Sequence, residues 1–538
     1  MYRVEALLSP RLFLAPQRVG KRLYFLSNLS GALSLYAMDW GGSVPEPLLP
    51  PDIAFQNPTL MTGWPFYVFP ELEKILVMLD RDGDENYQPM LIPIEGGYPE
   101  PAFGDRTDGY RVHLMKAYRD RAWVYLNAES RKEPTIEALR ADLRTGDVLL
   151  MGKSKYGSYV VAVSSDHRKA VLLDGYTHGD SVLYLWQDGA DGRRLLLGKP
   201  IEERSPGEVV PLNGIEHVAF TEGDGGLLMR TTLFEDTYGL AHATLARPAE
   251  IRPVRITGTR HRGAGEIEDF ESLGGRRYLV TYNIDGENWA YAGTFEEAAA
   301  ELRLETVICG EGELAHGVIA SHKHHHDEAS EGFAFAISTA TSPTQIYTVD
   351  PGSAASAPAI LRHTRERVLS IPHENLSQGE DASFDSHDGL RTSARLYRPA
   401  AGLDFQGPRP LVYYVHGGPQ SQERPDFAWF SMPLIQHLTL RGFAVFVPNV
   451  RGSTGYGLRY AKWVDRDWGG RDRLDHVHAL KVLAGDPGLD VRRTGVVGRS
   501  YGGYMSLTLA ARHPGQWAAA VDMFGPYDLI TFSQRIPE

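Results

Sequence analysis

The chain has 538 residues, with 55 Lys and Arg against 68 Asp and Glu, a formal net charge of −13 and one cysteine. Its length argues for at least two domains, and its acidity disfavours nucleic-acid and anionic-membrane partners, which attract basic surfaces. A single cysteine excludes an internal disulfide framework and suits a reducing compartment. No apolar run reaches the ~18 residues of a membrane span, and the first residues lack a signal peptide's apolar core. We therefore expect a soluble, cytoplasmic protein.

The first two-thirds of the chain repeats one pattern seven times, at intervals of about fifty residues. In each copy, a short run rich in aromatic and β-branched residues is followed by a polar or glycine-containing break and a second such run. Runs this short are typical of strands, and the breaks are typical of hairpins. The regular spacing predicts a seven-bladed β-propeller rather than a string of unrelated β domains. The first runs are 23–26, 75–78, 122–125, 170–173, 227–229, 278–280 and 333–337.

After about residue 376 the pattern changes to alternating strands and helices. This alternation implies parallel strands joined by crossovers, and therefore an α/β domain. We expect the propeller over 1–375 and the α/β domain over 376–538. The predicted strands are 391–397, 410–415, 443–447, 494–497 and 517–523, and the predicted helices are 429–441, 474–483 and 503–512.

The sequence Gly498-Arg-Ser500-Tyr-Gly502 has the form G-x-S-x-G and follows the apolar pair Val496 and Val497. In this context the motif places a serine on a tight turn from a strand to a helix, with its oxygen exposed. Glycines at 498 and 502 remove β-carbons that would clash in such a turn, and the helix N-terminus directs N–H groups at developing negative charge. Ser500 is the predicted nucleophile; an ordinary strand-to-helix turn is the alternative.

A second motif, His416-Gly-Gly-Pro419, follows directly after the predicted strand 410–415. Hydrolases with a nucleophilic serine need two N–H donors for the tetrahedral oxyanion, one from the residue after the serine and one from a glycine-rich loop. We predict that Tyr501 and Gly418 supply these N–H groups. Gly417 and His416 are expected to support the loop; the alternative for His416 is the role of general base.

The chain has, in this order, the predicted propeller, the His416-Gly-Gly-Pro419 loop and the tight turn at Ser500, which is called a nucleophile elbow. In this the whole chain resembles the prolyl oligopeptidase family of serine peptidases, nearest its acylaminoacyl-peptidase branch. Segments 449–457 and 498–504, and Trp468 with Asp472 and Asp475, also match that branch. The resemblance implies an α/β-hydrolase domain with a Ser-Asp-His triad, which cleaves short peptides in a chamber between the domain and the propeller.

The C-terminal part departs from this pattern, because the acid and base of such a triad follow the serine in the order Ser, Asp, His. The only histidine after Ser500 is His513, on the helix that leads away from the elbow. Asp522 lies within the final strand, and Asp528 at a helix start, where capping is its ordinary role. Residues 526–538 are too few for a further crossover and strand. We therefore expect a truncated α/β-hydrolase domain, with the triad Asp and His beyond its end and little or no amidase activity.

One histidine-rich segment could bind a metal. It runs from His322 through His324, His325 and His326 to Asp327, and imidazoles suit zinc or nickel. Nothing else in the sequence indicates a metal, so we predict a solvated blade loop there, no metal site and no cofactor, with a transition-metal site as the alternative.

The function predicted from these features is a serine peptidase that hydrolyses short peptides, as an acylaminoacyl-peptidase or an oligopeptidase. Two alternatives stay open: a noncatalytic interaction protein that uses the propeller as a platform, and an esterase, because the same elbow cleaves esters. An Asp and a Gly-His in the reading frame after residue 538 would favour the peptidase over the interaction protein. Short peptides are the expected partners, and homo-oligomerisation is left open.

Overall fold

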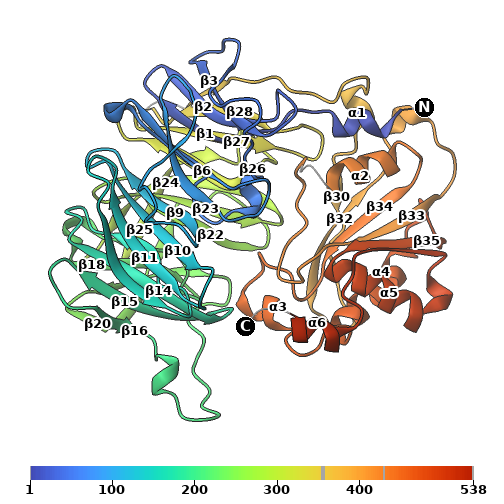
Figure 1. Cartoon of the computed structure of the whole chain (residues 1–538). Helices are drawn as coiled ribbons and strands as arrows, with labels where there is room; N and C mark the ends of the chain where they lie inside the picture. The colour runs from blue at the N-terminus through green and yellow to red at the C-terminus, as the bar shows by residue number, and fades with distance from the viewer. Residues whose placement is uncertain (1, 353–357, 428–430, 536–538) are drawn as a thin grey trace.

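A computed structural model describes residues 2–352, 358–427 and 431–535, with only the backbone described for 321–324. Seven sheets, antiparallel except for one edge strand, form a ring, and an eighth, mostly parallel sheet forms a second domain beside it (Figure 1). The predicted seven-bladed propeller and α/β domain are thus confirmed. None of the described helices is both long and apolar enough to cross a membrane.

Six of the blades contain four strands and blade 6 contains five. The repeated runs found in the sequence form the second strand of blades 1 to 5 and 7, and the third-numbered strand of blade 6. Blades 1 to 4 consist of β1 (Phe13–Val19), β2 (Arg22–Ser27), β3 (Ser34–Asp39) and β4 (Glu46–Pro47); β5 (Phe66–Phe69), β6 (Lys74–Leu79), β7 (Gln88–Pro93) and β8 (Glu100–Pro101); β9 (Tyr110–Tyr118), β10 (Trp123–Ser130), β11 (Ile136–Asp142) and β12 (Val148–Ser154); and β13 (Tyr159–Val163), β14 (Lys169–Thr177), β15 (Asp180–Gln187) and β16 (Arg193–Leu197).

The other three blades follow the same order along the chain. In blade 6 the extra strand β21 pairs in parallel with β25 at the outer edge. Blades 5 to 7 consist of β17 (Val218–Phe220), β18 (Gly226–Thr231), β19 (Gly239–Thr244) and β20 (Arg247–Pro253); β21 (Arg255–Thr257), β22 (Gly265–Ser272), β23 (Arg277–Ile284), β24 (Glu287–Glu296) and β25 (Glu301–Cys309); and β26 (Val318–Asp327), β27 (Gly332–Ser338), β28 (Gln345–Asp350) and β29 (Ala359–Arg362).

The apolar runs are continuous because both faces of each blade are buried against neighbouring blades. On β2, Tyr24 and Leu26 belong to one core cluster with Val68 and Val77 of blade 2. Their neighbours Leu23 and Phe25 point to the opposite face and pack with Ile346 of blade 7. Successive strand residues alternate between faces, so a strand between two blades needs apolar residues at every position.

Side-chain contacts close the ring between its first and last blades, since blade 7 contains no strand from the N-terminal segment. The backbone N–H of Phe13 on β1 donates to Thr344 Oγ1 at 2.9 Å, a buried contact. Arg18, also on β1, forms an ion pair with Asp350 of β28 at 2.7 Å. The ring closure therefore depends on polar contacts as well as on the shared apolar core.

The histidine-rich segment is not the predicted solvated loop, because 318–327 form strand β26. His325 is buried, with 3% of its surface exposed. Its Nε2 lies 3.2 Å from Arg119 Nη2, and its ring packs at 6.2 Å from that of Tyr67. Partners from blades 2 and 3 thus let a polar residue occupy an inner strand. The side chains of His322 and His324 lie outside the described residues.

The sheet of the second domain has the strand order β30-β32-β34-β33-β35-β36, and β31 pairs with β32. Strands β33 to β36 are parallel, and β32 runs antiparallel to β34. The strands are β30 (Glu380–Asp381), β31 (Phe384–Asp385), β32 (Arg391–Tyr397), β33 (Arg409–Val415), β34 (Ala444–Asn449), β35 (Leu489–Arg499) and β36 (Ala519–Met523), and the helices are α2 (Ser431–Thr439), α3 (Leu458–Lys462), α4 (Arg471–Leu483), α5 (Tyr501–Arg512) and α6 (Leu529–Arg535).

Helices cover both faces of this sheet. Leu480 of α4 and Leu509 of α5 pack on one face. On the other face, Ile435 of α2 packs together with Leu7 of the N-terminal helix α1 (Val4–Leu8), so the first residues of the chain lie on the second domain (Figure 1). The predicted boundary at 375/376 falls between the last propeller strand and β30.

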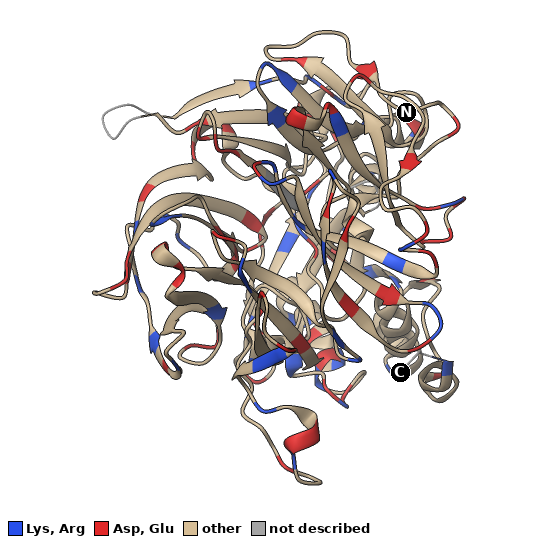
Figure 2. Ribbon diagram, turned by 60° about the vertical axis from the view of Figure 1, so that its left-hand side comes forward, with Lys and Arg blue, Asp and Glu red and all other residues tan. Residues whose placement is uncertain are grey.

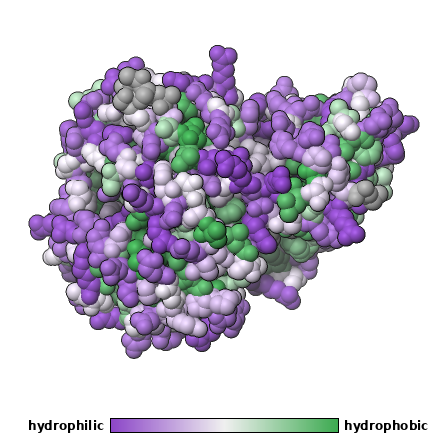
Figure 3. All heavy atoms as spheres, turned by 90° about the horizontal axis from the view of Figure 1, so that it is seen from above, coloured by the Kyte–Doolittle hydropathy of each residue, from purple (hydrophilic) through white to green (hydrophobic). Residues whose placement is uncertain are grey.

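Seen from above, hydrophilic residues cover most of both domains (Figure 3).

Replacing Thr344 with valine should destabilise the ring. The buried N–H of Phe13 would lose its acceptor, and an unsatisfied buried donor costs about 1–3 kcal/mol. Urea unfolding followed by tryptophan fluorescence should report this loss. Thr306→Val is the control, because Thr306 is a half-buried residue of β25 whose hydroxyl has no hydrogen bond among the described residues. Equal stability of both variants would contradict the role given to Thr344.

Candidate active site

Ser500 sits on a sharp turn between β35 and α5. Its backbone has φ 56° and ψ −122°, a region that residues with a β-carbon rarely adopt and that stores strain at functional sites. Its N–H donates to Met523 O at 3.0 Å, and its carbonyl accepts from Tyr504 N at 3.0 Å. The residue is exposed although its neighbours on both sides are partly or fully buried. This is the geometry of a nucleophile elbow.

The glycines of the motif are required by close backbone contacts. A β-carbon on Gly498 would lie 2.2 Å from Gly502 O, and one on Gly502 would lie 2.1 Å from Val415 O. These distances are far below van der Waals contact, so β33, β35 and the start of α5 can meet only if both residues lack a side chain.

The glycine-rich loop lies against the elbow. A β-carbon on Gly417 would lie 3.1 Å from Arg499 O and 3.4 Å from Ser500 Cβ. Gly418 follows with φ 118°, in the region that favours glycine. The structure thus brings together the two motifs that the sequence analysis singled out, more than eighty residues apart in the chain.

His416 is buried behind this loop, and both of its ring nitrogens are occupied. Nε2 lies 2.9 Å from Ser453 Oγ, and Nδ1 lies 2.7 Å from Gly417 O. Burial lowers the pKa of the imidazole, because it penalises the charged form. The ring contacts the loop and the 449–457 segment; no hydrogen bond joins it to Ser500 among the described residues.

Tyr501 is held by a buried carboxylate that the sequence analysis had noted only as a family match. Its hydroxyl donates to Asp472 Oδ2, and the same oxygen accepts from Gly469 N at 3.1 Å. The ring of Trp468 stands edge-on to Tyr501 at 4.9 Å. Burial raises the pKa of Asp472. This contact joins the N-terminus of α4 to the residue after Ser500, and no local pattern in the sequence signals it.

One group of side chains among the described residues has the spacing of metal ligands: His387, Asp388 and Asp475. The buried guanidinium of Arg451 already occupies this group, with Nε 2.7 Å from Asp475 Oδ2 and Nη2 2.9 Å from Asp388 Oδ1. Hydrogen bonds from Arg451 lower the pKa of Asp388 to about 2. The arginine supplies the positive charge that a cation would bring, so these residues do not fit a metal.

The acids and the histidine that follow Ser500 have partners elsewhere. His513 Nε2 contacts Arg473, and Asp522 accepts from Gly525 N at 2.7 Å. Asp528 accepts from the N–H groups of residues 530 and 531 at the start of α6, the capping role that the sequence indicated. None of the three is hydrogen-bonded to Ser500 within the described part of the chain.

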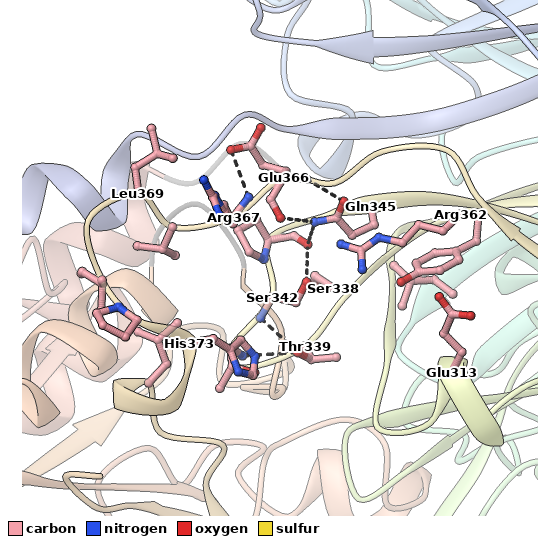
Figure 4. A pocket seen from close by; sticks show the side chains of 18 of the residues that line it. Glu313, Ser338, Thr339, Ser342, Gln345, Arg362, Glu366, Arg367, Leu369 and His373 are labelled. Atoms are coloured by element: carbon pink, nitrogen blue, oxygen red, sulfur yellow. Dashed lines mark hydrogen bonds between the residues drawn. The ribbon is translucent and has the colours of Figure 1, made fainter. Parts of the chain in front are cut away.

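A sizeable pocket lies elsewhere, between blade 7 and the linker to the second domain (Figure 4). It has a volume of about 770 Å³. Gln345 donates to Glu366 O at 2.7 Å in its wall, and His373 Nε2 lies 3.1 Å from Thr341 Oγ1. No residue of the elbow or of the glycine-rich loop lines it, so its size does not mark it as the reaction site.

The elbow and the adjoining glycine-rich loop, in a doubly covered α/β sheet beside a seven-bladed ring, define an α/β-hydrolase fold joined to a β-propeller. Residues 428–536 match the model of the prolyl oligopeptidase family, which confirms the resemblance that the motifs indicated.

Individual relatives agree with this match. An uncharacterized peptidase, YuxL, of Bacillus subtilis is 32% identical over 167 residues, 30% of this chain and 24% of the relative. The acylamino-acid-releasing enzyme of Mus musculus is 33% identical over 161 residues, 30% of this chain and 20% of the relative. The aligned regions thus span a quarter or less of these relatives. The crystal structure of a puromycin hydrolase shares the fold, with a TM-score of 0.75 and 18% identity over 99% of this chain and 80% of that one.

Alanine at position 498 should disrupt the elbow. Its β-carbon would overlap the Gly502 carbonyl, and overpacking of this kind typically costs about 1–3 kcal/mol, with the upper end expected against rigid backbone. Thermal unfolding of the second domain measures the loss. Gly515→Ala serves as the control, since a β-carbon there meets nothing within 4 Å. A Gly498→Ala protein as stable as the control would show that the turn adapts easily.

Glu423, in the loop after Pro419, gives a prediction about pH. Ser431 donates to its carboxylate, and burial raises its pKa to about 8, against about 4.3 for an unfolded glutamate. Between these values the folded chain binds a proton that the unfolded chain does not, so wild-type stability falls as pH rises from about 4.3 to about 8.

Glu423→Gln removes this titration. The free energy of unfolding of the variant, minus that of wild type, should be larger at pH 8.5 than at pH 5. Urea unfolding at both pH values measures this change. Exposed Glu374→Gln is the control and should show no such gain. A pH-independent difference between Glu423→Gln and wild type would contradict the assigned titration.

Proposed function

We propose that this chain carries the nucleophile, Ser500, of a serine-type peptidase that acts on short peptides, in the manner of a dipeptidyl or acylaminoacyl peptidase. The observation that carries the proposal is the exposed serine on a positive-φ elbow, packed against a glycine-rich loop, within a segment that matches a peptidase family. An ordinary turn from a strand to a helix can form without a serine in this strained backbone conformation. Such conformations persist mainly at functional sites, which favours a functional role for Ser500.

In the proposed reaction, Ser500 Oγ attacks the carbonyl carbon of the scissile bond. The carbonyl oxygen then carries negative charge, which the N–H groups of Tyr501 and Gly418 stabilise; removal of one such donor typically costs about 10²–10³ in kcat. Asp472 and Trp468 hold Tyr501, and His416 supports the loop of Gly418. A base must take the proton of the hydroxyl, and no described imidazole is hydrogen-bonded to Ser500.

Short substrates are proposed on two grounds. The relatives include a dipeptidyl aminopeptidase of Pseudoxanthomonas mexicana and the acylamino-acid-releasing enzyme of Mus musculus. In addition, propeller residue Asn283 contacts Gln422, close after the glycine-rich loop. A propeller this near to the elbow leaves little room for a folded protein substrate.

Reaction with a fluorophosphonate tests the nucleophile without a natural substrate. Ser500 Oγ would bond to phosphorus as fluoride leaves, and added imidazole would take the hydroxyl proton. We expect labelling at Ser500, located by peptide mass spectrometry, to rise at least ~tenfold with imidazole, part of the ~10²–10⁴ that a positioned base contributes.

Two variants interpret this result. Ser500→Ala should abolish the labelling, whereas Ser506→Ala, on the same helix but with its hydroxyl bonded to Gly502 O, should leave it unchanged. Label spread over other serines, or none at any imidazole concentration, would overturn the assignment of Ser500.

A further inference from the structure

The glycine-rich loop is attached to the propeller as well as to its own domain. Four residues after Gly418, Gln422 accepts from Asn283 Nδ2 of blade 6 at 2.6 Å. Two residues later, Arg424 donates through Nη1 to Glu268 at 2.8 Å and through Nε to Gly286 O at 2.8 Å. Blade 6 therefore holds the segment that directly follows the predicted oxyanion donor.

The neighbouring loop of the second domain is attached in the same way. Gly457 N donates to Glu266 of blade 6 at 2.6 Å, and Arg459 N donates to Asp236 of blade 5 at 3.0 Å. The side chain of Leu458 fits against Gly179 of blade 4, where a β-carbon would lie 2.5 Å from it. Three adjacent blades thus contact the end of the 449–457 loop and the first turn of α3.

The two loops are also bonded to each other. Thr454 N donates to Ser421 O at 2.9 Å, and Gln422 Nε2 donates to Tyr456 Oη at 2.8 Å. A displacement of either loop from the propeller would therefore be passed to the other.

Apart from the amide contact between Asn283 and Gln422, the contacts described at this interface that involve a charged side chain have one polarity. The propeller supplies carboxylates, and the second domain supplies backbone N–H groups and guanidinium groups. Two more pairs follow the rule: Arg391 with Asp285 at 3.2 Å and Arg395 with Glu287 at 2.6 Å. Acidic and basic residues are both spread over the whole fold (Figure 2).

We propose that Glu268 and Arg424 are positioning residues, which set the place of the Gly418 loop beside Ser500 through the docking of blade 6. The catalytic consequence rests on the proposed function; the positioning itself does not. Arg424 is 8% exposed, and the second oxygen of Glu268 accepts from Asn288 Nδ2 at 2.6 Å, so both partners are held in place.

The energetic reason lies in the burial of Arg424, whose partner Glu268 is itself only partly exposed. Removing one member of a buried ion pair leaves the other charge without compensation, which is strongly unfavourable. Arg424 can relieve this only by turning towards water, and its backbone lies in the segment that continues from Pro419. Loss of the Glu268 charge should therefore loosen the glycine-rich loop rather than blade 6, whose strand pairing stays intact.

Hydrogen exchange of the whole chain tests the proposal. In Glu268→Gln, we expect amides of residues 417–424 to exchange at least ~tenfold faster, as expected for a local loss of stability, while amides of β23 keep wild-type rates. Glu296→Gln is the matched control, since it breaks an Arg–Glu pair of the same blade, at 2.7 Å from Arg276, away from the second domain. Unchanged exchange over 417–424, or an equal effect of Glu296→Gln, would overturn the proposal.

A charge exchange adds a second test. Glu268→Arg combined with Arg424→Glu should restore slow exchange over 417–424, at least in part, whereas each single change should not. If Glu268→Gln does not fold, Arg424→Lys keeps the charge but loses the two-pronged contact, and should still speed exchange of this segment. No effect of Arg424→Lys would then count against the proposal.

The rate of fluorophosphonate labelling at Ser500 separates this proposal from the proposed function. Slower labelling in Glu268→Gln, with labelling unchanged in Glu296→Gln, supports both. An unreactive Ser500 in the wild-type chain overturns the peptidase assignment but leaves the exchange result standing.

Discussion

The site depends on the meeting of three backbone segments with no side chain between them. Gly498 and Gly502 let β35 cross the start of α5, and Gly502 lies against the carbonyl of Val415 at the end of β33. Because these contacts are between main-chain atoms, they cannot relax by a change of rotamer. They place Ser500 at the apex of the turn and bring Gly417 into contact with it, and the remaining features of the site hold this arrangement.

Buried charge in the second domain is arranged around that crossing. Arg451 is wholly buried between Asp388 and Asp475, and Asp472 is satisfied by Tyr501 and Gly469. A buried charge is tolerated only when hydrogen bonds and counter-charges replace its water. These networks link α4 and the 449–457 loop to the elbow, so they serve the geometry of the site as well as the stability of the core.

The propeller supplies a different constraint. Its blades bury both faces of their strands, which leaves the turns and strand ends at the rim of the ring for polar contacts. On blades 5 and 6 these positions carry carboxylates such as Asp236, Glu266 and Glu268, which accept from donors of the second domain. The acidic composition of the chain is thus partly used at the junction of its own domains.

Local patterns in the sequence were enough to predict the seven blades, the alternation of strands and helices, the elbow and the glycine-rich loop. Each of these depends on periodicity or on backbone demands within a few residues, such as the glycines around Ser500. The same reasoning was wrong for residues 322–327, where the polar side chains suggested a loop. The segment is part of a strand, because Arg119 and Tyr67, far away in the sequence, contact the buried His325.

Other features were decided by the tertiary structure alone. The bond from Tyr501 to Asp472, the ion pair between Arg424 and Glu268, and the packing of α1 on α2 all join residues without a shared local pattern. The amino-acid sequence by itself determined which segments become strands, helices and tight turns, since those choices follow from short-range sterics and from the spacing of apolar residues. Only the folded chain decided which buried charges meet, because that depends on how distant surfaces fit together once water is excluded.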